Sequence, residues 1–144
     1  MAFESRYLEE TANEIQQRIS MTNAALAELK VSNLTLEGLE NEKKGSQLFV
    51  PIGGGSYIKA KLETSDKVVV GVGADVAVEK SVKEAKEELE GRIADLEKTR
   101  EVLGNQLNQV VERIQHNRNM MEEVTAKLRE GEKQSGVRKA KKGA

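Results

Sequence analysis

The stretch QLFVPIGGGSYIKAKLETSDKVVVGVGADVAVEK, residues 47–80, decides the fold of this chain. It contains four short runs rich in β-branched and aromatic residues, at positions 47–52, 57–62, 67–72 and 76–80. A glycine-containing turn lies inside each pair of runs, and the polar residues 63–66 link the two pairs. Such runs, joined by tight turns, predict two consecutive β-hairpins.

Apolar side chains alternate along these runs and gather on one face of each hairpin. The larger ones are Leu48, Val50, Ile52, Ile58, Leu62, Val68, Val70, Val72, Val76 and Val78. Four short strands with one apolar face cannot bury a sufficient core, and their open edges invite further strands. We therefore expect other subunits to complete the sheet, with these ten residues forming the assembly surface.

Long charged segments flank the hairpins at residues 2–43 and 80–130, and each carries a seam with alternating steps of three and four residues. The first seam comprises Leu8, Ala12, Ile15, Ile19, Thr22, Leu26, Leu29, Asn33, Leu36 and Glu40. The second comprises Val82, Lys86, Leu89, Ile93, Leu96, Arg100, Leu103, Leu107, Val110, Ile114, Asn117, Met121, Val124 and Leu128. Most of these positions are apolar, which is typical of coiled-coil helices. If the hairpins turn the chain back, the two helices pair antiparallel.

Three polar residues, Asn33, Arg100 and Asn117, occupy seam positions that favour apolar groups. Polar residues at such positions set the register of a coiled coil at some cost in stability, whereas ligand binding is the alternative interpretation. We favour the register role for all three.

Composition restricts both the shape and the chemistry of the chain. Of 144 residues, 33% are charged and 38% hydrophobic, so a single compact core would be thin and an elongated protein is expected. No cysteine is available for a disulfide or a thiolate metal site, and His116 is the only histidine. We therefore expect neither a metal nor a cofactor.

No motif indicates an enzyme. The glycine-rich residues 53–56 lack the Lys-Ser/Thr pair and the following helix that a phosphate-binding loop requires. His116 lies beside a seam position on a charged helix, where a surface role is the simpler interpretation. Adjacent acid pairs such as Glu122 and Glu123 point apart on a helix and lack a pocket that would raise a pKa.

Charge is distributed unevenly along the chain. Five basic residues and no acidic one follow Glu132, and without them the chain has 18 basic against 24 acidic residues, a charge of −6. A body with this charge is not expected to bind nucleic acid. Residues 133–144 are predicted to be a disordered basic tail, either solubilising or in contact with nucleic acid or an acidic partner surface.

The chain has no apolar run that could cross a membrane, and its first ten residues carry glutamates where a signal peptide would carry lysines. These features predict a soluble, cytoplasmic protein with no membrane partner.

Antiparallel pairing brings the two ends of the helical segments together. Apolar residues that would meet there are Phe3, Tyr7, Leu8, Met120, Met121, Val124 and Leu128. A two-stranded seam covers only its central stripe, so we expect an exposed, methionine-containing tip that can adapt to many shapes. For Met121, Val124 and Leu128, an ordinary seam role remains the alternative.

The order helix, two hairpins, helix, together with the strings LFVPIGGGSYIKAK (48–61), DKVVVGVGA (66–74) and VEK (78–80), resembles the α-class subunits of archaeal prefoldin. The similarity extends over about residues 5–130. Four strands, rather than two, indicate the α class. The resemblance implies an α+β fold with a long antiparallel two-helix coiled coil and two central hairpins. These elements form one domain, residues 1–132, and the hairpins join a multi-subunit β-barrel body.

The resemblance also implies a function. Family members assemble as two α-class and four β-class subunits, capture non-native proteins at the coiled-coil tips without ATP, and pass them to a group II chaperonin. The basic tail departs from the common pattern. Two other functions remain open: a structural scaffold or filament subunit without client binding, and a nucleic-acid-associated adaptor that acts through the tail.

Overall fold

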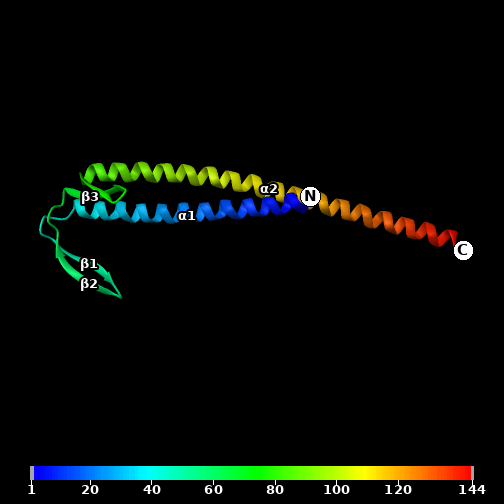
Figure 1. Ribbon diagram of the computed structural model, residues 1–144, viewed down its shortest axis with the longest axis horizontal. Helices are drawn as coiled ribbons and strands as arrows, with labels where there is room; N and C mark the ends of the chain where they lie inside the picture. The colour runs from blue at the N-terminus through cyan, green and yellow to red at the C-terminus, as the bar shows by residue number, and fades with distance from the viewer. Residues whose placement is uncertain (1, 144) are drawn as a thin grey trace. The chain divides into compact units, whose positions relative to one another are not determined.

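The computed structural model describes residues 2–143, and these form two long helices with two β-hairpins between them in sequence (Figure 1). The elements are α1 (Ala2–Glu40), β1 (Gln47–Gly53), β2 (Ser56–Lys61), β3 (Lys67–Gly73), β4 (Val76–Ser81) and α2 (Val82–Lys142). The predicted α+β arrangement of coiled-coil helices and hairpins is therefore confirmed. The chain divides into a hairpin unit, residues 21–100, and a terminal unit, residues 1–20 with 101–144.

Each hairpin is a separate two-stranded antiparallel sheet. In the first, Val50 lies opposite Ile58, and in the second, Val70 lies opposite Val78, as the alternation predicted. At the tips, Gly54 and Gly55 have φ angles of 60° and 76°, a conformation that glycine adopts without steric cost. The turns therefore bring the apolar residues of paired strands onto the same face.

The second hairpin packs on the helices of its own unit. A buried cluster of Leu36, Val82 and Ala85 joins α1 to α2, and the partly buried Val68 and Val70 of β3 pack against it. Only one face of the second hairpin is covered in this way.

Ser81 explains where α2 begins. Its hydroxyl accepts a hydrogen bond from the backbone amide of Glu84 at 3.1 Å, while the amide of Val82 donates to the carbonyl of Asp66 at 2.9 Å. A serine with a glutamate three residues later is a typical helix-capping sequence. The helix therefore starts directly at the end of β4.

Both units contain an antiparallel helix pair along the predicted seams. In the hairpin unit, Lys30 pairs with Glu97 at 3.6 Å and Lys86 with Glu40 at 3.4 Å. Buried seam residues across the two units are Leu8, Ala12, Ile15, Thr22, Leu26, Leu36, Val82 and Leu103. Arg100 is exposed, and its guanidinium donates a hydrogen bond to the Oδ1 atom of Asn23 on α1 at 3.5 Å, so this polar seam position contacts the partner helix.

Asn33 lies in the hairpin unit's seam, and its buried Oδ1 atom has no hydrogen-bond partner within residues 2–143. An unsatisfied buried acceptor is costly, so Asn33→Leu should raise the free energy of unfolding by about 1 kcal/mol. Urea denaturation followed by circular dichroism would measure this. Asn13→Leu, at an exposed position of α1, is the matched control and should stay within about 0.5 kcal/mol of the original chain. An equal effect of both changes would contradict the explanation.

The ends of both helices differ from the sequence prediction. The first helix was expected to continue to residue 43, but α1 ends at Glu40, where the amides of Asn41 and Glu42 bond to carbonyls three residues earlier. The prediction that residues 133–144 are disordered is also wrong for residues 133–142, because α2 continues to Lys142. Extending a formed helix costs far less than nucleating one, and Lys, Arg, Ala and Gln are good helix formers.

Among the described residues, none of the helices combines the length and the apolar character that crossing a membrane requires.

Candidate functional site: an apolar tip and the hairpin faces

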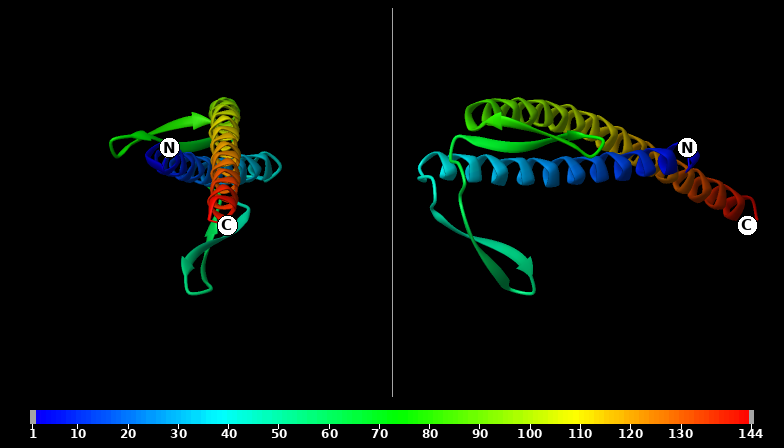
Figure 2. Two further views of the ribbon diagram at one scale, coloured as in Figure 1. Left: turned by 90° about the vertical axis from the view of Figure 1, so that its right-hand side faces the viewer. Right: turned by 60° about the vertical axis from the view of Figure 1, so that its left-hand side comes forward.

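The terminal unit pairs the start of α1 with the middle of α2. Arg113 meets Glu4 at 3.0 Å and Arg118 meets Glu9 at 3.6 Å, which ties the first turns of α1 to α2. Beyond this pairing α2 continues alone, and residues 118–140 are exposed (Figure 2).

Apolar side chains at this end remain uncovered, as the sequence predicted for most of them. On α1, Phe3 is 92% exposed and Tyr7, one turn later, is 68% exposed. On α2, Met120 and Met121 are about 40% exposed. Side chains four residues apart lie on the same face of a helix, so Phe3 and Tyr7 form one apolar stripe. We call these four residues the apolar tip.

Val124 and Leu128 follow the seam register on α2, but no part of α1 covers them, and they are 50% and 64% exposed. Met121 is 41% exposed, so the exposure of all three residues favours their place on the tip over the seam alternative. Leu8 is the opposite case. It is only 7% exposed and lies in the seam, so its expected place on an exposed tip is wrong.

The hairpin faces form a second apolar surface. Of the predicted assembly residues, Val50, Ile52, Ile58, Val72, Val76 and Val78 are between 42% and 58% exposed. Leu48, Leu62, Val68 and Val70 are partly buried. Phe49 and Tyr57, 63% and 62% exposed, lie on the other face of the first hairpin. The prediction of one apolar face missed these two aromatic residues. They alternate with the predicted apolar residues along their strands, so the sequence pattern already places them on the opposite face.

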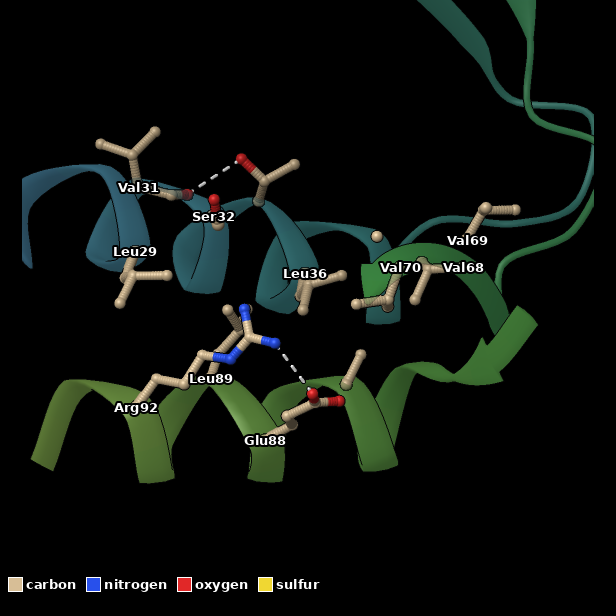
Figure 3. A pocket seen from close by; sticks show the side chains of 13 residues that line it. Leu29, Val31, Ser32, Leu36, Val68, Val69, Val70, Glu88, Leu89 and Arg92 are labelled. Atoms are coloured by element: carbon tan, nitrogen blue, oxygen red, sulfur yellow. Dashed lines mark hydrogen bonds and ion pairs between the residues drawn. The ribbon is translucent and has the colours of Figure 1, made fainter. Parts of the chain in front are cut away.

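A groove of about 480 Å³ lies within the hairpin unit, where α1, β3 and α2 meet (Figure 3). Leu29, Leu36, Val70 and Leu89 line it together with nine further residues. Its walls are therefore mainly aliphatic, with Arg92 and Glu88 supplying charge at one side.

Comparison with known proteins identifies the family. The family model described as "Prefoldin subunit" matches residues 8–127, most of the chain. This chain belongs to the prefoldin family. Among curated relatives, the prefoldin subunit alpha of Thermofilum pendens is 33% identical over 114 residues, covering 79% of this chain and 88% of the relative. The prefoldin subunit alpha of Methanococcus vannielii is 28% identical over 130 residues, 90% of this chain and 85% of the relative.

A solved structure shows the same architecture. The cryo-EM structure of filamentous PFD from Methanocaldococcus jannaschii superposes with a TM-score of 0.71 at 28% identity, covering 81% of this chain and 96% of that chain. The family match and the α-subunit relatives from archaea confirm the resemblance to the α class of archaeal prefoldin. The family match ends at residue 127, so the last part of α2 lies outside it.

Within residues 2–143, no three His, Cys, Asp or Glu side chains come together as a metal site would require. His116 is an exposed residue of α2. The apolar tip and the hairpin faces are the exposed apolar surfaces among the described residues.

An ion-pair network ties β4 to α2 beneath the hairpin. The Lys80 Nζ atom donates to the Glu88 carboxylate at 2.6 Å, and Arg92 donates to the same carboxylate at 3.0 Å. These bonds, above all the one from Lys80, hold the pKa of Glu88 below its usual range. The stability that the network contributes is therefore present above the usual glutamate pKa and is lost as pH falls through the lowered value.

We expect the free energy of unfolding to fall between about pH 6 and pH 3, and Glu88→Gln to remove part of that fall. Urea denaturation at several pH values would measure the difference between the two chains. Glu87→Gln, which changes an exposed neighbour, should leave the pH dependence as it is. The same flattening in both variants would show that the pairing with Lys80 is not the cause.

Proposed function

We propose that this prefoldin subunit is part of an ATP-independent holdase. Two copies assemble in the cytoplasm with four β-class subunits, and the hexamer captures non-native proteins and passes them to a group II chaperonin. Membership of a family of chaperones that act without enzymatic chemistry supports this role. The observation that carries the proposal is the apolar tip, where Phe3 and Tyr7 are left largely exposed.

Multivalency accounts for both capture and release. Each exposed side chain can bury only part of its surface against a client, so one contact is weak and dissociates quickly. Several tips on one assembly raise the effective concentration of the remaining contacts once the first has formed. A client is then retained by avidity, and no nucleotide is needed for transfer.

Assembly accounts for the hairpin faces. Two-stranded sheets are marginal on their own, and Val50 and Ile58 present a half-exposed apolar pair directly opposite each other. Strands of neighbouring subunits would cover these faces and pair with the open edges in a common β-barrel body.

The test is aggregation of a chemically unfolded protein diluted into buffer without ATP, followed by light scattering. This chain, assembled with a β-class partner and verified by size-exclusion chromatography, should suppress scattering at about one hexamer per client. Adding a group II chaperonin with ATP should then recover folded client. Unchanged scattering with a properly assembled oligomer would contradict the proposal.

The second candidate is a filament or scaffold subunit that binds no client. The filamentous assembly named for the solved relative favours it. Electron microscopy of the purified chain alone, together with the aggregation assay, distinguishes the two functions. Long filaments without holdase activity would support the scaffold, whereas discrete oligomers that suppress client aggregation would exclude it.

A further inference from the structure

The last ten residues of α2, residues 133–142, form a basic extension. They carry five positive charges and no negative one, and they lie beyond the family match, which ends at residue 127. Lys133, Arg138 and Lys139 are exposed, and in the part of the chain that the structure describes they form no ion pair. The extension therefore presents charges that its own fold does not use.

Two general explanations do not account for the extension. Cations stabilise a helix C-terminus through its dipole, but that effect is confined to about the last turn, and Lys133 and Arg138 precede it. Solubility is a second explanation, yet the extension moves the net charge from −6 to −1, toward the neutrality that favours association. A binding role is therefore the better explanation.

On α2, the extension follows Met120 and Met121 of the apolar tip and then the exposed Val124 and Leu128. At 1.5 Å per residue, Lys133 and Lys139 lie about 8 and 16 Å beyond Leu128 along the axis. An extended polypeptide covers about 3.3 Å per residue. A client residue that lies about two to five positions from the one in contact with Leu128 therefore reaches these cations. The preceding turns, residues 121–132, carry four glutamates against Lys127 and Arg129, so they attract an acidic segment less than the extension does.

We propose that the basic extension binds acidic segments of non-native polypeptides, so that preferred clients are those in which an acidic run flanks an apolar segment. This inference rests on the proposed holdase function and names the client class of the same tip. The apolar residues hold the client's apolar segment, and the extension holds the flanking carboxylates. Because the groups are exposed, salt should weaken the contact.

The experiment compares two fluorescent unfolded peptides with one apolar segment, flanked by glutamates in the first and by glutamines in the second. Fluorescence anisotropy with the assembled hexamer should show the acidic peptide binding about fivefold more tightly at low salt. The preference should shrink at about 0.5 M salt, where charges are strongly screened. Replacing Lys133, Arg138 and Lys139 by Gln removes three of the five charges, so it should remove most of the preference while leaving the neutral peptide's affinity unchanged.

The matched control makes the same change of charge elsewhere, at the exposed Lys44, Lys83 and Lys98, and should keep the preference. Circular dichroism reports whether α2 stays helical in the variant, and the salt dependence of the original chain does not rely on any variant.

Equal affinity for both peptides would overturn the inference while leaving the holdase intact. Failure to bind either peptide would contradict the holdase itself. Tighter binding of single-stranded DNA than of the acidic peptide would assign the extension to nucleic acid and overturn the inference.

Discussion

Changing Phe3, Tyr7, Met120 and Met121 together to Ser should weaken client capture about tenfold or more and leave the oligomer assembled. These side chains are 39% to 92% exposed, so their loss opens no cavity in the helix pair. Each one removed takes away part of the 1.5–3 kcal/mol that full burial of a large apolar side chain supplies, about 0.5 kcal/mol or more per contact. The losses multiply across several tips that bind one client.

The measurement is the hexamer concentration that halves client aggregation, with size-exclusion chromatography to verify assembly. A matched control changes four exposed apolar residues away from the tip, Met21, Leu34, Val102 and Val111, to Ser. This control should hold clients as well as the original chain does. If both variants capture clients normally, the apolar tip is not the binding site. If the tip variant fails to assemble, these residues are structural.

Changing Val50 and Ile58 to Glu should abolish assembly with β-class subunits while the isolated chain keeps its helices. The two residues face each other across β1 and β2 and are 45% and 54% exposed, so the unassembled chain tolerates charge there. Two facing carboxylates inside an apolar interface would cost several kcal/mol, and each 1.4 kcal/mol weakens association tenfold. We expect association to fall by more than a hundredfold.

Size-exclusion chromatography with light scattering on the mixed subunits would measure this loss, and circular dichroism would verify the helices. Val102→Glu with Val111→Glu places the same charges on exposed sites of α2 and should assemble normally. A hexamer formed by the hairpin variant would show that this hairpin face does not form the interface.

Local patterns in the sequence were sufficient to predict every element. Steps of three and four residues, strict alternation, and glycines at the turns each reflect the geometry of one helix, strand or hairpin, so distant contacts are not needed to interpret them. The seam positions of α1 from Leu8 to Leu36 are buried or half-buried as the pattern predicted. The exposure of Phe3 and Tyr7 also followed from their places off the seam.

Other features depend on how the helices meet. Leu8 and Leu128 both follow the seam pattern, yet Leu8 is buried and Leu128 is exposed, because α1 covers α2 only as far as its own first turn. The seam period repeats without change along α2, so it contains no information about where the partner helix stops. Similarly, residues 133–144 have few side chains that could be buried, which predicted disorder, whereas residues 133–142 continue the helix of α2.

The sequence by itself thus determined the elements, their seams and the apolar character of the hairpins, since each of these is a property of neighbouring residues. Only the tertiary structure decided which seam residues are covered, that Arg100 contacts Asn23 on the partner helix, and that α1, β3 and α2 line a groove. The physical reason is that burial requires a second surface, and the distance between two surfaces is set by packing between residues far apart in the chain.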